Sequence, residues 1–263
     1  MNNKSKNTML KTSNLSIGYT SKKKQTIIAK NIDIKIDTAK LIALIGKNGI
    51  GKSTLLRTLS KVQPKLKGEV FIASKNLAAY SNSALAEKIS IVLTEKIPPS
   101  NLTVYELIAL GRQTYTNWIG SLTDSDKAKI NNAINLCNIN TLKSKKIDEL
   151  SDGQYQKMMI ARALAQDTPI ILLDEPTAHL DINNKIEIFK LLKNLVETEQ
   201  KLIIISTHEL QLALHASNDL WIMTEDEFLC DTTKNHIKNN NLDKIVSSEF
   251  VKFDKIKEQF MFE

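Results

Sequence analysis

The sequence has few of the features that mark membrane-spanning, secreted or disulfide-bonded proteins. Only two of its 263 residues are cysteine, Cys137 and Cys230, and neither belongs to a Cys-x-x-Cys or Cys/His pattern. We therefore expect both to be reduced packing residues. No apolar stretch approaches the roughly 18–20 residues that a helix needs to cross a bilayer. The opening segment, MNNKSKNTML, has no long apolar core like that of a secretory signal, so we expect a cytoplasmic chain.

Aromatic residues are also scarce, at 5% of the chain, although the net charge is +7. The lysines are scattered, apart from Lys22–Lys24 and Lys143–Lys146, and no aromatic residues alternate with them as a base-stacking surface requires. We therefore expect no nucleic-acid partner. The basic residues are better explained as solvated surface, whose charge also favours approach to an anionic membrane.

The composition is that of an ordinary globular protein, with 42% apolar and 25% charged residues. Its length suits one large α/β domain or two small ones. It has no internal repeat and no low-complexity linker. The apolar runs LIALI (41–45), IILL (170–173) and LIII (202–205) have the length of strands, as in a parallel sheet that is covered on both faces.

Strand and helix patterns alternate along most of the chain. Strands are predicted at Leu10–Ser16, Ile27–Ile36, Leu41–Ile45, Gly68–Ala73, Ile89–Leu93, Ile170–Leu173 and Leu202–Ser206. Helices are predicted at Ser53–Leu59, Asn82–Lys88, Lys185–Glu197 and Leu210–Ala216. Gly18 and residues 21–24 are expected to form the turn between the first two strands. Hairpins are expected within 220–230 and from 251–253 with 260–262.

From about residue 98 to residue 165 the apolar residues recur at helical spacing, so we expect a helical insert here. Thr123 or Asp124 would cap its middle helix.

The segment GKNGIGKST matches the pattern G-x-x-x-x-G-K-[ST] and lies between an apolar strand and a helix, as this motif requires. Glycines allow backbone N–H groups to wrap a phosphate, and the helix start adds its positive dipole end. Lys52 would reach the β- and γ-phosphates, Ser53 would ligate Mg²⁺, and Thr54 would lie at the α-phosphate. The loop predicted to bind nucleotide consists of Gly46, Lys47, Asn48, Gly49, Ile50, Gly51, Lys52, Ser53 and Thr54.

The run IILLDEP ends in two acids at the carboxyl end of a predicted strand, where ligands bind in open α/β sheets. We expect Asp174 to hold Mg²⁺ through water and Glu175 to orient and polarise an attacking water. The alternative, that both acids only cap secondary structure, is disfavoured by the phosphate loop.

The pentapeptide LSDGQ (150–154) lies between these two motifs. With all three, the chain resembles the ATP-binding subunits of ABC transporters over about residues 8–230. The resemblance implies an α/β P-loop NTPase core with a mixed or parallel sheet, an N-terminal antiparallel β subdomain and an inserted helical subdomain. Within a single domain, 1–263, residues 1–95 and 166–230 would form the nucleotide-binding core, 96–165 the helical signature subdomain and 231–263 a C-terminal extension.

The resemblance also assigns roles to isolated residues. His208, in STHE, would sense the γ-phosphate, which with Glu175 and Lys52 completes the catalytic set. Tyr19 would stack on adenine. His179 is interpreted as a packing or interface residue, with Asp181 as the aspartate of the loop that follows the acidic strand. The two remaining histidines, His215 and His236, are expected at the surface.

Ser151, Gly153 and Gln154 begin a predicted helix and would form an anion site that has no lysine or metal ligand of its own. Such a half-site is complete only when it closes on the γ-phosphate held by a second copy. We therefore expect a head-to-tail dimer with two ATP molecules between the subunits, as the resemblance also implies. Asp152, where the family usually has glycine, must point away from the phosphate.

A second departure is Thr94, in IVLTEK, where the family usually has a glutamine that contacts Mg²⁺ and water. Thr94 is kept as a weak metal candidate, and whether it or Glu95 takes the role is left open.

The segment LTVYELIALGRQTYTNWIG (102–120) is similar to the insert of importers for iron–siderophore complexes, haem and cobalamin. This implies an ATPase on the cytoplasmic face of the cell membrane, with two permease subunits and, indirectly, a substrate-binding protein as partners. Its face around Val104–Arg112 would form the groove that receives a permease helix, and the alternative is ordinary core packing. The alternatives are a soluble ABC ATPase that acts on ribosomes or DNA, and a non-catalytic regulatory binder.

Overall fold

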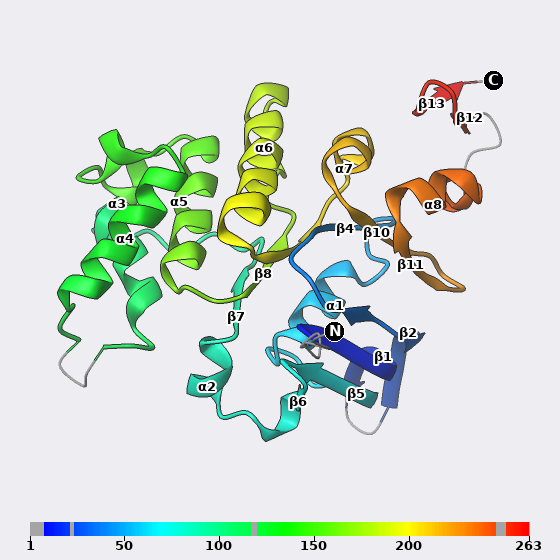
Figure 1. Cartoon of the computed structure of the whole chain (residues 1–263), viewed down its shortest axis with the longest axis horizontal. Coiled ribbons are helices and arrows are strands. Elements are labelled where there is room, and N and C mark those ends of the chain that lie inside the picture. Colours follow the sequence, from blue (N-terminus) through cyan, green and yellow to red (C-terminus); the bar gives the residue numbers. More distant parts are fainter. Residues whose placement is uncertain (1–7, 22–23, 117–119, 246–250, 263) are drawn as a thin grey trace, which may run out of the picture.

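The structure is a computed structural model, and it describes residues 8–21, 24–116, 120–245 and 251–262. Its centre is a six-stranded sheet in the order β11-β10-β4-β9-β8-β7 (Figure 1). Neighbouring strands from β10 to β7 are parallel, and β11 pairs antiparallel with β10, which confirms the expected mixed α/β sheet. The strands are β4 (Leu41–Ile45), β7 (Ile89–Val92), β8 (Ile170–Asp174), β9 (Leu202–Ser206), β10 (Asp219–Met223) and β11 (Phe228–Thr232).

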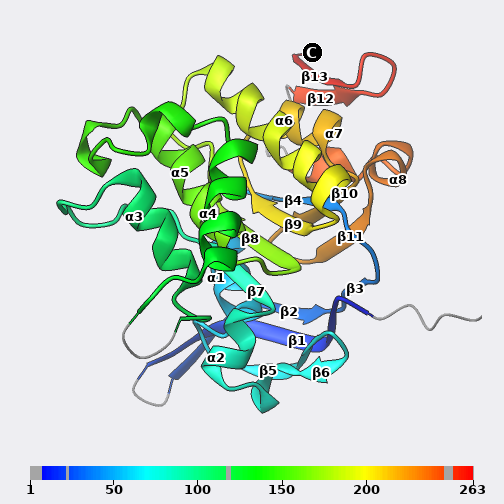
Figure 2. The same ribbon diagram turned by 60° about the vertical axis from the view of Figure 1, so that its left-hand side comes forward.

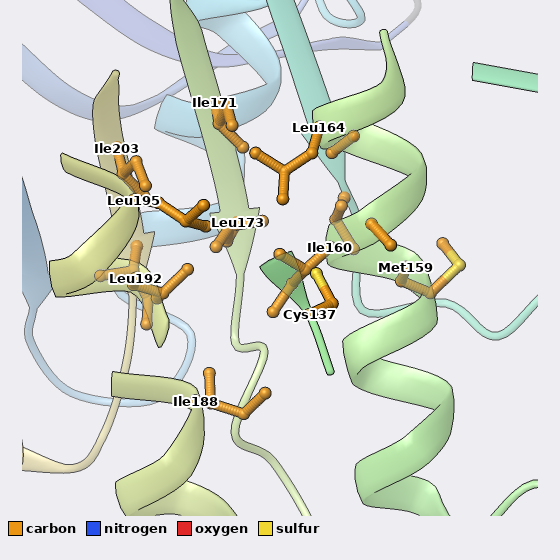
Figure 3. Packing of buried hydrophobic residues seen from close by; sticks show 14 of the residues in the cluster. Cys137, Met159, Ile160, Leu164, Ile171, Leu173, Ile188, Leu192, Leu195 and Ile203 are labelled. Atoms are coloured by element: carbon orange, nitrogen blue, oxygen red, sulfur yellow. The ribbon is translucent and has the colours of Figure 1, made fainter. Parts of the chain in front are cut away.

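Every residue of β4, β8, β9 and β10 is buried, because both faces of this sheet are covered. Successive side chains of a strand point to opposite faces, so Ile171 and Leu173 enter one core and Ile170 and Leu172 enter the other. In the first core, α5 (Asp152–Ala165) and α6 (Ile182–Glu199) flank β8 (Figure 3). Strand β8 is thereby fixed from both sides, and its last residue is Asp174.

A second sheet packs through α1 (Lys52–Leu59) against the other face of the central sheet. It contains β1 (Leu10–Ser21), β2 (Lys24–Ile32), β3 (Lys35–Ile36), β5 (Lys67–Ile72) and β6 (Lys75–Asn76).

Two expectations about this sheet were wrong. Gly18 is not in a turn but inside β1, where it pairs with Ile27. The single strand expected at 27–36 is interrupted at residues 33–34, between β2 and β3. Of the turn expected at 21–24, residues 22–23 lie outside the described residues.

The helical insert is present as α3 (Val104–Ala109), α4 (Asp124–Leu136) and α5, which pack together beside the central sheet (Figures 1 and 2). Thr123 caps α4 in a capping box with Asp126. Val104, Leu107 and Ile108 are at most 1% exposed, so they form the core of this helical group. For these three residues the structure shows core packing, the alternative to a face that receives a partner helix.

The remaining helices are α2 (Asn82–Ala86), α7 (Leu210–Ala216) and α8 (Thr233–Lys238), with 3₁₀ turns at Leu77–Ala79, Leu110–Arg112, Asn140–Leu142, Ile147–Glu149 and Asn241–Ile245. The expected C-terminal hairpin forms from β12 (Val251–Asp254) and β13 (Gln259–Phe262). Throughout the described ranges, no helix combines the length and the apolar character that crossing a bilayer demands.

Two isolated residues differ from expectation. His236 is fully buried, not at the surface, because α8 packs against β10 and the imidazole contacts the carbonyl oxygen of Leu220. Cys230 is exposed, whereas Cys137 is a packing residue as expected, and both are free thiols. His215 is exposed, as expected.

Candidate active site

The phosphate loop connects the end of β4 to α1, and Lys52 is the first residue of that helix. Gly51 has φ of 114°, and a Cβ there would lie 2.2 Å from Cγ2 of Ile28. Gly49 has φ of 77° and faces open space. The two glycines are therefore required for different reasons: Gly51 by conformation and by close packing, and Gly49 by conformation alone.

The side chain of Lys52 lies inside this loop and is 4% exposed. Its Nζ donates to the carbonyl oxygens of Gly46 (3.0 Å) and Lys47 (3.2 Å). It also lies 3.1 Å from Nε2 of His208 and 3.8 Å from Oε1 of Glu175. The two predicted catalytic partners are thus gathered around the ammonium group.

The charge on Lys52 is held in a buried position. Burial lowers the pKa of Lys52 below its ordinary value, and the nearby carboxylates of Glu175 and Asp174 oppose that change. A buried cation held by weak carbonyl acceptors fits a group that exchanges those acceptors for phosphate oxygens.

Asp174 is 2% exposed at the carboxyl end of β8, and its Oδ1 accepts two hydrogen bonds. One comes from Oγ of Ser53 (2.9 Å) and the other from Oγ of Ser206 (2.7 Å). Ser53 and Asp174, two of the three predicted metal ligands, are therefore in direct contact. Carboxylate and hydroxyl oxygens are hard donors of the kind that Mg²⁺ prefers, so this pair fits the ion.

Ser206 was missed by the sequence analysis. It is fully buried, it pairs with Asp174 across β8 and β9, and its Oγ also accepts the backbone N–H of Glu175 (2.9 Å). The available signal was its place two residues before His208, at the end of a neighbouring strand.

Glu175 begins the turn after β8 with a left-handed backbone, φ of 48°, that turns its side chain away from that of Asp174. Its Oε1 is 2.7 Å from Nε2 of His208. Because Nε2 is also close to Lys52, this nitrogen either donates to Glu175 or accepts from Lys52, depending on the tautomer. Glu175, His208 and Lys52 therefore form one polar cluster.

Tyr19 and Thr94 border the site. The Tyr19 hydroxyl is 2.7 Å from Oγ1 of Thr54, and the side chain is half exposed. Thr94 donates from Oγ1 to the backbone oxygen of Asp174 (3.3 Å), so its hydroxyl is used on the main chain. Glu95 forms an ion pair with Arg57 on α1. The partners of Thr94 and Glu95 are thus the Asp174 main chain and Arg57. The hydrogen bonds to the Asp174 carboxylate come from Ser53 and Ser206.

The LSDGQ segment (150–154), called the signature from here on, leads into α5, which lies away from α1 (Figure 1). Ser151 and Gln154 form a capping box, in which each side chain bonds the other's backbone N–H. A Cβ on Gly153 would lie 2.6 Å from Oδ1 of Asn184, at the start of α6, so a larger residue here would require the Asn184 side chain to shift. Asp152 points to Lys96, with 2.6 Å between Oδ1 and Nζ. Asp181 caps α6 through Asn184.

The parallel sheet, the glycine-rich loop and the acidic strand end define a P-loop nucleotide-binding protein. The family model described as "ABC transporter" matches residues 29–178. The chain is 40% identical over 199 residues to the achromobactin transport ATP-binding protein CbrD of Dickeya dadantii, covering 76% of this chain and 72% of that protein. It is 35% identical over 209 residues to the iron(3+)-hydroxamate import ATP-binding protein FhuC of Bacillus subtilis, covering 80% and 76%.

Among solved structures, the chain is similar to the dimeric ATP-binding cassette MJ0796 bound to ADP and phosphate in a post-hydrolysis state. The TM-score is 0.73 at 26% identity, and the match covers 86% of this chain and 99% of that one. The chain therefore belongs to the ABC transporter family and is an ATP-binding ATPase subunit of that family.

Proposed function

We propose that this protein powers an importer for an iron complex, such as a siderophore or haem, or for cobalamin. The relatives are named for the transport of achromobactin and of iron(3+)-hydroxamate, which supports an iron complex. The proposal depends most on one observation. A complete phosphate loop with its acids lies in one part of the chain, and the separate capped turn Ser151–Gln154, which we expect to bind an anion, begins α5.

This separation supports a head-to-tail dimer, in which the Ser151–Gln154 turn of one copy closes on ATP held by Lys52 of the other. The similar cassette that was solved with ADP and phosphate is itself a dimer.

Mg²⁺ would be held by Ser53 and, through water, by Asp174, and it supplies neutralisation of phosphate charge. Lys52 exchanges its backbone carbonyl partners for phosphate oxygens when ATP binds. The Glu175 carboxylate orients the attacking water and takes its proton. His208 would sense the γ-phosphate, and its contacts with Glu175 and Lys52 would couple that phosphate to both residues.

Glu175→Gln tests this assignment. It should retain ATP binding but lose about 10²–10⁴-fold in hydrolysis rate, the usual contribution of a general base. Glu197→Gln, at an exposed position on α6, is the matched control and should hydrolyse ATP at the normal rate. Normal turnover by Glu175→Gln would reject Glu175 as the base.

The permease would dock in a groove of 420 Å³ where the central sheet meets the helical group. Its apolar side chains include Val62, which is 56% exposed, with Leu85 and Ile91, and Arg162 lies beside them. Ile91 belongs to β7, which leads to Thr94, so a helix in this groove would be connected to the nucleotide site. Val62→Arg should abolish co-purification with the permease and leave ATP binding intact.

The protein would therefore be peripheral to the cytoplasmic face of the membrane, and a substrate-binding protein would be its indirect partner. Fractionation separates this from a role on ribosomes or DNA. Recovery with membranes that contain the permease supports the importer, and recovery with ribosomes or nucleoid would reject it.

A further inference from the structure

This chain departs from its family at Asp152 and at Thr94, and an ion pair between Asp152 and Lys96 connects these two places. Asp152 is the first residue of α5, next to the capping residue Ser151. Lys96 lies two residues after Thr94, and its Nζ is 2.6 Å from Oδ1 of Asp152. The same loop is fixed to α5 a second time, because the Tyr155 hydroxyl accepts the backbone N–H of Ile97 at 2.9 Å.

The charge of Asp152 has opposite consequences for the helix and for an anion site. A carboxylate in the first turn interacts favourably with the helix dipole. The same carboxylate repels a phosphate that approaches the N–H groups of that turn. Both side chains are more than half exposed, and His179 is a second, weaker electrostatic partner of this charge. Lys96 is the cation in hydrogen-bonding contact with it, and the two also line one 200 Å³ cavity with Glu175.

We propose that Lys96 is a positioning residue of the signature half-site, which neutralises Asp152 so that this half-site can accept the ATP of a second copy. The inference depends on the proposed ATP-sandwich dimer. Lys96 turns the Asp152 carboxylate toward the loop after Thr94 and away from the helix start. A chain with glycine at position 152 would have no charge there for Lys96 to neutralise.

The test measures ATP-driven dimerisation in the Glu175→Gln background, where hydrolysis does not reopen the dimer. Analytical ultracentrifugation gives the dimer fraction at each ATP concentration. Lys96→Met should raise the ATP concentration for half-maximal dimerisation by about threefold to tenfold, as expected for one uncompensated charge near water. The shift should shrink at high salt, because exposed charges are screened. ATP affinity of the dilute monomer should not change.

The decisive variant is the double substitution Lys96→Met with Asp152→Gly. It should dimerise like the Glu175→Gln parent, because the charge that needs compensation is gone. Lys127→Met, which removes an exposed lysine paired with Asp124 on α4, is the control and should have no effect. A Lys96→Met defect that persists in the double variant would overturn the inference. Failure of the parent to dimerise with ATP would instead overturn the dimer, and this inference with it.

Discussion

Ser206 and Asp174 face each other across β8 and β9, and the Ser206 hydroxyl donates a 2.7 Å hydrogen bond to Oδ1 of Asp174. The same hydroxyl accepts the backbone N–H of Glu175. One buried oxygen thus positions both acids of the site. It comes from β9, which belongs neither to the phosphate loop nor to the IILLDEP run.

Removing this hydroxyl by Ser206→Ala should lower both activity and stability. A hydrogen bond to a charged group is worth about 1.5–3 kcal/mol. We therefore expect kcat to fall by about tenfold or more, and the free energy of unfolding to fall by a similar amount. Ser217→Ala is the control, since Ser217 is buried but its Oγ has no partner within the described ranges. Equal effects of the two substitutions in ATPase assays and urea titrations would contradict the role of Ser206.

Alanine at the two loop glycines should have graded effects. Gly49→Ala adds a Cβ in open space, so its cost is the left-handed backbone alone, about 1–2 kcal/mol. Gly51→Ala adds a clash with Ile28 to an unfavourable φ, and should lose more ATP affinity and more stability. Calorimetric titration with ATP and thermal unfolding measure both. A larger loss of ATP affinity and stability in Gly49→Ala than in Gly51→Ala would show that the loop readjusts freely.

The buried ion pair of Arg112 and Asp126 should be a major stability element of the helical insert. The side chains are 8% and 5% exposed with 2.9 Å between them, and Arg112 also donates to the carbonyl oxygen of Ala165. Arg112→Met leaves the Asp126 carboxylate without its cation and should cost about 3–5 kcal/mol. In the same urea titrations, Lys127→Met at an exposed pair should cost about 0–1 kcal/mol.

His236 should make folding sensitive to mild acid. Burial lowers the pKa of His236, whose Nε2–H donates to Leu220 while Nδ1 accepts from Asn241 in the neutral form. Above the ordinary histidine pKa of about 6.5 neither state binds a proton, so stability is complete there. As the pH falls below that value, the unfolded chain gains a proton that the folded chain does not, and stability is lost.

The check is the free energy of unfolding between about pH 7 and pH 5, a range centred near the histidine pKa. His236→Gln keeps a donor for Leu220 and should flatten this dependence, by up to about 1.4 kcal/mol per pH unit. His215→Gln, at an exposed histidine, should leave the slope unchanged. An unaltered slope in His236→Gln would show that His236 does not titrate in this range.

Those parts of the molecule that depend on local sequence were predictable. The apolar runs predicted β4, β8 and β9, and the loop before α1 follows from its glycines and its flanking elements. Ser206 was not predictable in the same way, because its role arises from the pairing of two strands that are distant in sequence. The choice between a docking groove and core packing at Val104–Arg112 could not be made for a related reason, since helical periodicity predicts that a face is buried but not what covers it. The burial of His236 likewise depends on where α8 packs.

Lys52 carries a further consequence. Its ammonium group is already surrounded by two carbonyl oxygens, an imidazole and a carboxylate. In the proposed function, ATP would therefore not meet a bare charge at this loop but would enter an exchange, in which the protein's own oxygens are the outgoing ligands. The affinity for nucleotide would then be a difference between two sets of contacts, so a change that weakens the resting set would raise the affinity as surely as a new contact to the phosphates.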